Sequence, residues 1–490
     1  MRSRWLPVTI GILSCVLAAC SGDDDGGHTQ QTLAEPPEFV SRDGALHGTL
    51  TVAQNTINVA GQSVMASVYN DLFVPPTLRV RPGDTIFLTL RNRIAQQTNL
   101  HYHGMNVSPL DNSDNVFIHV NPTDDFDYQV KIPTDHPMGL FYYHAHMHGL
   151  TEFQIGSGMS GGLVVDGILD SFPQLRDVTR RVMLLKDIQI RNGRVPDPPD
   201  SGEATMRTLN GQVNPLINIR PGETQLWSIG NIGADIYYHL SMDGLVFYEI
   251  ARDGNPHTKV VARTELFLPT SSRVDVLVQG PSEGRYALNT MAIDMGPQGD
   301  MYPEVTLGTL VSSGAAEAPV VLPTDFLPVE NLRGKPIAMR RTFTFFEDDS
   351  GDQFFINGQQ FNPDVVNTRV TLGDIEEWTI NNCSGENHVF HIHQLDFQVI
   401  EINGVEQPFI GRQDTVNLDY RDTDGPEDCP TDSDPHGRVK VLIPFTNPVI
   451  LGKFVYHCHI GEHEDNGMMQ VIEVVDDSGG PLEGPGHGHH

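Results

Sequence analysis

Residues 75–94 read PPTLRVRPGDTIFLTLRNRI, and the same pattern recurs twice, as NPLINIRPGETQLWSIGNIG at 214–233 and NPDVVNTRVTLGDIEEWTINN at 362–382. Each copy has an alternating apolar strand, a Gly-Asp or Gly-Glu turn, and a second alternating strand. The turn glycines, spaced by 139 and 151 residues, are Gly83, Gly222 and Gly373. These spacings are the size of one domain, so the repeat predicts three homologous β-rich domains.

The rest of the chain agrees with an all-β fold. It shows little of the 3.6-residue periodicity of amphipathic helices, and its short apolar runs are separated by Gly and Pro. A chain of 490 residues also exceeds what one core can hold. We therefore predict three tandem Greek-key β-sandwich domains, with the limits 45–170, 171–325 and 326–477.

Residues 457–468 read HCHIGEHEDNGM and hold one Cys, three His and one Met. In an extended strand successive side chains point to opposite faces, so His457 and His459 would face one way and Cys458 the other. One strand would then serve two metal sites back to back. A His and a Met follow five and ten residues after the Cys, far enough for a loop to return to the sulfur. Two His, one Cys and a weak axial Met are typical of blue-copper electron-transfer sites.

Three further segments carry alternating His residues: HYHG at 101–104, HAH at 144–146 and HVFHIH at 388–393. In the last segment, His391 and His393 share a face by parity, whereas His388 falls on the other face. This again assigns one His to the Cys site and two to a separate cluster. A single His-x-His is often a pair of surface residues, but four such segments, one of them interrupted by Cys, favour metal sites.

A second repeated element indicates which domains bind metal. It reads GLFYYHAH at 139–146, GRYALNTM at 284–291 and GKFVYHCH at 452–459. In the middle copy Asn289 and Met291 replace the two His, so we predict a spacer domain without copper. In the first copy Ala145 stands where the third has Cys458, so only the third domain can hold the thiolate site. The two His-bearing domains must face each other, because neither alone supplies enough ligands for the cluster.

At these motifs the sequence resembles the multicopper oxidases, a laccase-like family with three cupredoxin domains. The resemblance covers residues 45–475 and leaves no ligand position missing, which argues against a scaffold protein that has lost its metals. It implies four copper ions. The type 1 copper would be held by His388, Cys458 and His463, with Met468 axial. The type 2 copper would be held by His101 and His391. The type 3 pair would be held by His103, His144, His146, His393, His457 and His459.

The resemblance also implies a reaction. A reducing substrate gives single electrons to the type 1 site, the electrons pass along the His-Cys-His strand, and the cluster reduces O₂ to two waters. Oxygen reduction needs protons, and Asp114 and Glu464 resemble the acids placed near the cluster in bacterial laccases. The alternative for each is a solvated surface carboxylate.

The N-terminal segment is typical of export. Residues 1–20 read MRSRWLPVTIGILSCVLAAC, with two Arg, a short apolar run and Leu-Ala-Ala before Cys20. The last four residues resemble a bacterial lipobox, so we predict a lipoprotein signal with a lipidated Cys20; ordinary cleavage after an Ala is the alternative. Residues 21–44 would be a flexible linker. The predicted location is the periplasm or the outer membrane of a bacterium.

The net charge is −32, from 31 basic and 63 acidic residues. This argues against nucleic acid and anionic lipid surfaces as partners, and it would attract cations or simply favour solubility. We expect a monomer whose partners are O₂ and a small reducing substrate.

Beyond the signal, three cysteines remain. If Cys458 binds metal, Cys383 and Cys429 are the only possible disulfide, which an exported protein can form. We interpret His148 as a neighbour of the cluster and His239 as structural. Met291, Met295 and Met301 are too sparse for a Cu(I) site, so core packing is expected. The tail at 478–490, rich in Gly and His, could capture copper or be a disordered tail.

The sequence therefore predicts an exported laccase-like oxidase that acts on phenols or similar one-electron donors. One alternative is a metallo-oxidase that oxidises Cu(I) or another metal ion for copper tolerance. The non-enzymatic alternative is a copper-binding or envelope-assembly protein on the same fold.

Overall fold

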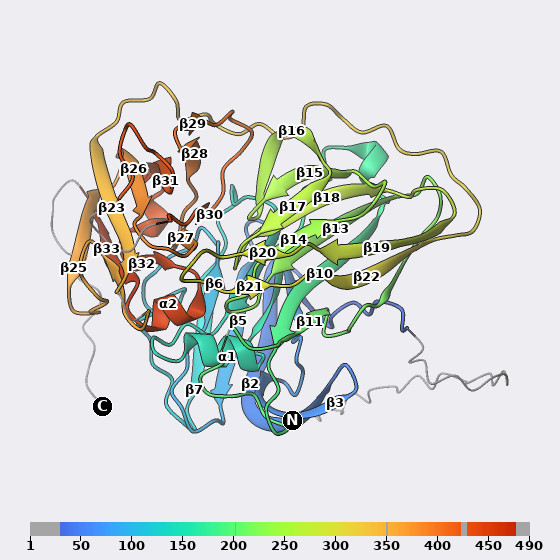
Figure 1. The fold of residues 1–490 in the computed structure, drawn as a ribbon, viewed down its shortest axis with the longest axis horizontal. Helices are drawn as coiled ribbons and strands as arrows, with labels where there is room; N and C mark the ends of the chain where they lie inside the picture. The colour runs from blue at the N-terminus through green and yellow to red at the C-terminus, as the bar shows by residue number, and fades with distance from the viewer. Residues whose placement is uncertain (1–29, 201, 349–350, 423–428, 477–490) are drawn as a thin grey trace, which may run out of the picture.

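The strands of the protein group into three β-sandwiches, each made of two sheets (Figure 1). The computed structural model describes residues 30–200, 202–348, 351–422 and 429–476. In Figure 1 the third sandwich (orange to red) and the middle sandwich (green to yellow) lie side by side, and the first (blue to cyan) lies below them. The predicted all-β fold of three tandem sandwiches is thus confirmed, while the domain limits stay predictions.

The first sandwich packs a five-stranded sheet on a four-stranded sheet. The five-stranded sheet, in the order β1-β4-β9-β8-β6, contains β1 (Glu38–Val40), β4 (Thr77–Val80), β6 (His101–His103), β8 (Gly139–His144) and β9 (Ser160–Val165). The other sheet, in the order β3-β2-β5-β7, contains β2 (Ala45–Val59), β3 (Gln62–Tyr69), β5 (Thr85–Asn92) and β7 (Asp125–Lys131). Helix α1 (Thr151–Ser157) precedes β9.

The middle sandwich has a six-stranded sheet, β11-β10-β13-β18-β15-β16, and a five-stranded sheet, β12-β22-β19-β14-β17. The first contains β10 (Thr179–Ile188), β11 (Met206–Leu209), β13 (Thr224–Asn231), β15 (Phe247–Arg252), β16 (Asn255–Arg263) and β18 (Arg273–Gln279). The second contains β12 (Leu216–Ile219), β14 (Tyr238–Ser241), β17 (Glu265–Leu268), β19 (Gly284–Thr290) and β22 (Val305–Ser312). A small hairpin joins β20 (Ile293–Asp294) to β21 (Met301–Tyr302), and a 3₁₀ turn spans Pro173–Leu175.

The third sandwich repeats this plan with the sheets β24-β23-β26-β31-β28-β29 and β25-β33-β32-β27-β30. The first contains β23 (Met339–Glu347), β24 (Phe354–Ile356), β26 (Ile375–Asn382), β28 (Gln398–Ile402), β29 (Val405–Glu406) and β31 (Arg438–Pro444). The second contains β25 (Val366–Thr371), β27 (His388–Ile392), β30 (Thr415–Leu418), β32 (Gly452–Cys458) and β33 (Met469–Val475). Helix α2 (Gly461–Asp465) follows β32, and a 3₁₀ turn spans Pro448–Ile450.

The repeated Gly turn crosses from one sheet of each sandwich to the other. β4 and β5, β12 and β13, and β25 and β26 flank the three turns, and no such pair shares a sheet. The turn glycines have φ of 93°, 80° and 102°, a region that costs glycine little and other residues more: Gly83, Gly222 and Gly373. Alternating strands on either side of this turn then place their apolar faces toward each other across the core.

The second repeat also occupies one place in the topology. β8, β19 and β32 are each the fourth or third strand of a sheet, with β9, β22 or β33 on one side and β6, β14 or β27 on the other. The two strand pairs that carry metal-type side chains are therefore β6 with β8 and β27 with β32. In register, His101 lies opposite His144 and His391 lies opposite His457.

Several contacts hold the sandwiches together around these strands. One apolar core runs continuously through the middle and third sandwiches and includes the buried rings of Trp227 and Trp378. Helices α1 and α2 meet across the first and third sandwiches, where Asp465 accepts hydrogen bonds from the backbone N–H groups of Gly149, Thr151 and Glu152. Such multiple bonds to one carboxylate hold α2 in a fixed place relative to α1.

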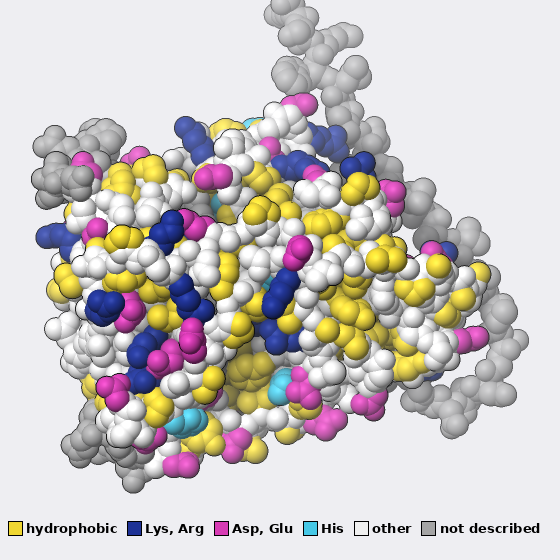
Figure 2. Space-filling view, turned by 90° about the horizontal axis from the view of Figure 1, so that it is seen from above, with side chains coloured by type: hydrophobic (Ala, Val, Ile, Leu, Met, Phe, Trp, Pro, Cys, Tyr) yellow, Lys and Arg dark blue, Asp and Glu magenta, His cyan; other side chains and the backbone are white. Residues whose placement is uncertain are grey.

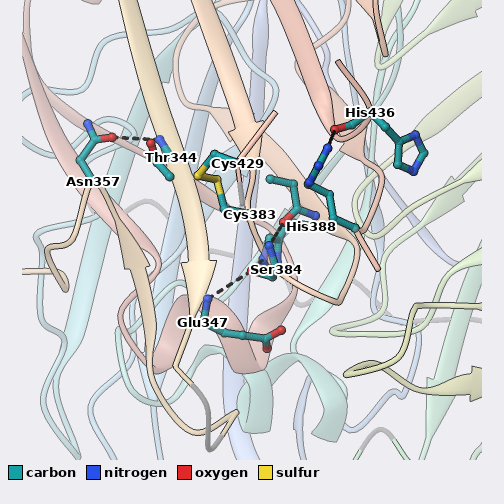
Figure 3. Close-up of a disulfide and its surroundings, with 10 residues drawn as sticks. Thr344, Glu347, Asn357, Cys383, Ser384, His388, Cys429 and His436 are labelled. Carbon is teal, nitrogen blue, oxygen red and sulfur yellow. Dashed lines mark hydrogen bonds between the residues drawn. A yellow bond between two sulfur atoms is a disulfide. The ribbon is translucent and has the colours of Figure 1, made fainter. Parts of the chain in front are cut away.

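Cys383 and Cys429 form a disulfide, as predicted (Figure 3). Cys458 is the free cysteine of the described residues, and it is buried. No helix within the described ranges combines the length and apolar character needed to cross a membrane. Cys20 and the tail at 478–490 lie outside the described residues, so those predictions stay predictions.

Candidate metal centres

Three donor atoms converge at the junction of β27, β32 and α2. The Nδ1 atoms of His388 and His463 lie 3.0 Å apart, and the Cys458 Sγ lies 3.8 Å from the first and 3.5 Å from the second. All three side chains are buried. Two ring nitrogens and a thiol that face one another in a closed space match the His₂Cys set of a copper site.

Each of these side chains is held from outside. The Nε2 of His388 lies 3.0 Å from the Ser384 hydroxyl, and the Nε2 of His463 lies 3.4 Å from a Glu386 carboxylate oxygen. The backbone N–H of Val389 donates to the Cys458 sulfur over 3.3 Å. These outer contacts fix which ring nitrogen of each histidine faces inward and hold the sulfur in place.

Met468 is fully buried in the same apolar core as Cys458. Its carbonyl accepts the hydrogen bond of the Cys458 N–H over 3.0 Å, and its own N–H donates to the His463 carbonyl. The backbone therefore returns Met468 to the Cys458 site, as the spacing predicts, whereas Met469 belongs to a separate apolar cluster with Val455.

Eight buried histidines form a second group between the first and third sandwiches: His101, His103, His144, His146, His391, His393, His457 and His459. Ring nitrogens from the two sandwiches face each other directly. His457 Nε2 lies 3.1 Å from His393 Nε2 and 3.4 Å from His146 Nε2. His459 Nε2 lies 3.1 Å from His103 Nδ1. Both groups of predicted ligands are thus brought together.

The chemistry of this cluster fits bound metal. The Nε2 atoms of His101, His144 and His391 are buried and have no hydrogen-bond partner among the described residues. Such orphaned polar atoms are costly unless an ion meets them. Burial lowers the pKa of His144 to about 3 and that of His146 to about 4, so these rings are neutral at physiological pH. A neutral imidazole is the form that binds metal.

The two predicted acids both lie at the cluster. Asp114 is buried, and its Oδ1 lies 2.9 Å from His101 Nδ1 and accepts the Tyr102 N–H over 2.9 Å. Its Oδ2 accepts a hydrogen bond from the Gln394 amide. Burial raises the pKa of Asp114 to about 7. The surface-carboxylate alternative is therefore wrong for Asp114.

Glu464 is equally buried and lies against two other histidines of the cluster. Its carboxylate oxygens lie 3.2 Å from His457 Nδ1 and 3.4 Å from His146 Nδ1, and the Thr151 hydroxyl donates to it. Burial opposes ionisation of Glu464, but the two histidine rings outweigh it and hold the pKa of this carboxyl below its usual value. The surface-carboxylate alternative is wrong for Glu464 as well, since it contacts His146 of the first sandwich and His457 of the third.

Two further residues at the cluster have no signature in the sequence. Asp414, which precedes β30, places a carboxylate oxygen 3.3 Å from His103 Nε2, and its carbonyl accepts a hydrogen bond from His391 Nδ1 over 2.8 Å. Tyr142 in β8 is buried, with its hydroxyl 3.1 Å from His459 Nε2. Asp414 has no His or Cys at a ligand-like spacing, and Tyr142 lies in an apolar strand. The sequence around these two residues therefore does not indicate that they contact the cluster.

Gly104 explains why a glycine follows the His-Tyr-His motif. Its φ is +79°, and a Cβ at this position would collide with the carboxylate of Asp414 and the guanidinium of Arg273. The glycine therefore leaves room for a buried ion pair beside the cluster.

The histidines that the sequence places outside the sites do lie outside them. His148 is exposed and packs on Phe361, and His239 lies on β14 beside Glu265. Neither belongs to a metal-type group of the described residues. Met295 is buried as expected, but the Met301 side chain is 66% exposed, so core packing is wrong for Met301.

A thiolate site next to a histidine cluster, on paired β-sandwiches, defines the chain as a copper-type oxidoreductase of the cupredoxin class. Models of the multicopper oxidase family match it over residues 51–168, 186–315 and 335–478. Together these segments span most of the chain. The protein belongs to the multicopper oxidase family, which implies copper as its cofactor.

The chain is also similar to individual proteins. The multicopper oxidase mco of Staphylococcus haemolyticus (strain JCSC1435) is 24% identical to it, with 83% of each chain covered. The cell division protein FtsP of Escherichia coli (strain K12) is 27% identical, with 86% of this chain and 87% of FtsP covered. The structure resembles that of a multicopper oxidase from Campylobacter jejuni described as a metallo-oxidase, with a TM-score of 0.78 and 24% identity. That match covers 91% of this chain and 96% of the other.

Proposed function

We propose that the protein is a laccase-like oxidase that couples the one-electron oxidation of phenols or similar donors to the reduction of O₂ to water. The observation that carries the proposal is the convergence of His388, Cys458 and His463. The two residues that flank Cys458 in the chain, His457 and His459, belong to the histidine cluster. Bound copper would supply one-electron chemistry at the first site and multi-electron reduction of O₂ at the second.

We propose four coppers, divided as the resemblance implies. The Cys458 site would hold one, with Met468 as a further, weaker ligand. His101 and His391 would hold a second, and the remaining six histidines of the cluster would hold a pair. The contacts of His101 and His391 support their assignment to one copper, because the Nδ1 of each ring has a partner outside the cluster while its Nε2 is buried without one.

The chain itself supplies the electron route. β32 ends at Cys458, whose neighbours His457 and His459 belong to the cluster. Consecutive Cα atoms are only ~3.8 Å apart, so an electron that enters at the Cys458 sulfur reaches the cluster through a short covalent path. The closed surroundings exclude water from both ends of this path.

Protons would enter through side chains that contact the cluster histidines. Asp114 lies against His101 and can hold a proton at a carboxylate oxygen, because burial raises its pKa to about 7. Glu464 lies against His457 as a carboxylate that can accept a proton. A cavity of about 700 Å³ at the junction of the three sandwiches is lined in part by Gln394, which donates to Asp114. This contact supports Asp114 as the acid with access to water.

Steady-state O₂ consumption tests the proposal, with a phenol, an aromatic diamine, Cu(I) and Fe(II) compared under the same conditions. We expect turnover with the aromatic donors. Cys458→Ser should abolish the blue absorption and the turnover but spare most of the cluster copper, because the cluster histidines remain. A blue band retained in Cys458→Ser would contradict the assignment of the electron-entry site. Copper binding without O₂ consumption would favour the non-enzymatic alternative.

The second candidate, a metallo-oxidase, is favoured by the carboxylates around His463. Glu386 lies against its Nε2, and Glu347 is buried with a carboxylate oxygen that has no hydrogen-bond partner among the described residues. Burial raises the pKa of Glu347 to about 7, and repulsion from Glu386 and Glu462 adds to it. A cation would relieve this repulsion, and carboxylates suit oxygen-preferring ions such as Mn(II) or Fe(II) better than Cu(I).

Glu386→Gln distinguishes the two candidates. In a metallo-oxidase it should lower kcat/KM for Fe(II) by about tenfold or more relative to kcat/KM for the phenol, since the amide keeps the shape but loses the charge that attracts a cation. Any effect through His463 is common to both donors. The exposed Glu330→Gln is the matched control. Equal rates with Fe(II) in both variants would exclude an entry route through Glu386.

We also propose that the protein is exported, lipidated at Cys20 and monomeric. The support is the Leu-Ala-Ala-Cys sequence at 17–20 and the disulfide between Cys383 and Cys429, which is typical of oxidising compartments.

A further inference from the structure

Arg273 is a fully buried arginine of the middle sandwich that lies beside the histidine cluster. It is the first residue of β18, and the middle sandwich, as far as the structure describes it, contributes no histidine to the cluster. Its Nη1 donates to Oδ1 of Asp414 over 2.9 Å, and its Nη2 donates to Oδ2 over 2.5 Å. Two parallel N–H···O bonds fix the plane of a carboxylate as well as its position.

Asp414, in turn, touches cluster histidines from two sandwiches. Its carboxylate lies against the outer nitrogen of His103, which belongs to the first sandwich, and its carbonyl accepts from the outer nitrogen of His391, which belongs to the third. The opposite nitrogen of each ring faces the cluster. Outer partners of this kind set the tautomer and the orientation of a ligating histidine.

A second residue of the middle sandwich supports the same segment. Asp253 accepts the backbone N–H of Arg273 over 2.9 Å and the hydroxyl of Thr415 over 2.8 Å. It also accepts the backbone N–H of Thr415. Arg273 and Asp253 therefore hold both residues of the Asp414–Thr415 pair, at the place where the third sandwich approaches the cluster.

Arg273 is the cation that faces the buried carboxylate of Asp414. Both side chains are inaccessible to solvent, and a buried carboxylate without a partner is costly. Burial disfavours the charged guanidinium, but Asp414 and Asp253 outweigh it and raise the pKa of Arg273 above its usual value. Among the arginine contacts of the described residues, no other joins the middle sandwich to a residue that touches two cluster histidines.

We propose that Arg273 is a positioning residue for the histidine cluster: through Asp414 it sets the orientation of His103 and His391. The middle sandwich, although it has no copper ligands of its own among the described residues, thereby controls how well the cluster holds its metal. The proposal rests on copper binding by the cluster, which the wild-type protein tests separately.

The test is copper retention in Arg273→Gln, measured by competition with a chelator while the type 2 EPR signal and the blue band are followed. We expect a loss of copper affinity of roughly 10- to 100-fold, confined to the cluster, with an altered type 2 hyperfine splitting. The blue band should be retained, because the Cys458 site contacts neither Arg273 nor Asp414. Thermal unfolding of the copper-free protein separates this effect from a general loss of stability.

Arg273→Lys is the conservative variant and keeps the proposal testable if Arg273→Gln does not fold. Lysine keeps the charge but cannot form the paired bonds, so an intermediate loss of affinity is expected. Arg252→Lys is the matched control. Arg252 also lies in the middle sandwich and binds a carboxylate, Glu249, but touches no cluster residue of the described chain.

A double-mutant cycle with Asp414→Asn decides whether Arg273 acts through Asp414. If it does, Arg273→Gln should cause little further loss in the Asp414→Asn background. Additive losses, or an unchanged EPR spectrum and copper affinity in both Arg273 variants, would overturn the proposal. A wild-type protein that binds no copper at the cluster would instead refute the proposed function, whatever the variants do.

Discussion

At the scale of single residues, Met468 and Met469 offer a matched pair. They are neighbours and both are buried, but Met468 shares a core with Cys458 whereas Met469 packs with Val455 and Val471. An axial thioether donates electron density and favours Cu(II), so its loss should raise the reduction potential of the Cys458 site. Leucine has a similar volume, and such a swap usually costs less than ~1.5 kcal/mol.

We therefore predict that Met468→Leu folds, binds copper, stays blue and has a higher potential, as measured by redox titration of the blue band. Met469→Leu should leave the potential unchanged. A shift that occurs only in Met469→Leu would mean that Met468 is not the axial residue.

Asp114 is the second residue with a sharp expectation. Its carboxylate contacts His101 and accepts hydrogen bonds from the Tyr102 N–H and the Gln394 amide. Asp114→Asn should therefore both displace His101 and remove an acid from the cluster. We predict that the turnover rate falls by about a hundredfold or more and that type 2 copper is held more weakly, in O₂-uptake and EPR measurements. Asp135 is exposed and lines the cavity of about 700 Å³ that Gln394 also lines. The control Asp135→Asn should change the turnover rate by less than about twofold.

At the scale of structural elements, local rules predict the ligand strands well. The alternation of β32 separates Cys458 from His457 and His459, and the register of β27 keeps His388 with the sulfur. Period-two parity is a property of the strand itself, so the sequence is enough to apply it.

The supports of the ligands could not be predicted in this way. Arg273 meets Asp414 across 141 residues, and Gln394 meets Asp114 across 280. Gln394 also has a φ of 63°, in a region of backbone conformation that favours glycine. A glutamine in the sequence does not predict this conformation, so the contact of Gln394 with Asp114 could not be expected from local sequence. Such contacts form where one sandwich packs against another. This packing leaves no periodic pattern in a single sequence.

The disulfide element is the next test. Cys383 is followed by Ser384, whose hydroxyl lies against His388 Nε2 and accepts a hydrogen bond from the Glu347 N–H (Figure 3). Replacing both cysteines by alanine should lower the free energy of unfolding by roughly 2–5 kcal/mol and shift the blue band, because the segment that supports His388 is released.

Absorption spectroscopy and thermal unfolding check both effects. Ser384→Ala is the control, since it removes the hydroxyl but keeps the disulfide; it should shift the band with a smaller change in stability. If the alanine pair leaves the band in place while Ser384→Ala moves it, the disulfide does not position His388.

At the scale of the whole molecule, charge and attachment determine where the protein works. On the face seen in Figure 2, Lys and Arg side chains are interspersed with Asp and Glu rather than gathered in one patch. The net charge of −32 would not favour an anionic membrane surface, so stable attachment would need a covalent lipid.

We predict that Cys20→Ala moves the protein from the membrane fraction to the soluble fraction with its oxidase activity intact. Immunoblots of fractionated cells, with Cys15→Ala as the control, measure this. A wild-type protein that is already soluble after export would show that the signal is an ordinary one.

The facing nitrogens of the cluster also join remote parts of the polymer. His146 and His457 are 311 residues apart, and His103 and His459 are 356 apart. An ion shared by such a pair is a reversible cross-link that closes a very long loop, and the chain-entropy model assigns such a link on the order of 5 kcal/mol at 25 °C. Copper would then cross-link the first and third sandwiches as well as take part in the reaction. A chelator should therefore separate these two sandwiches before it unfolds either of them.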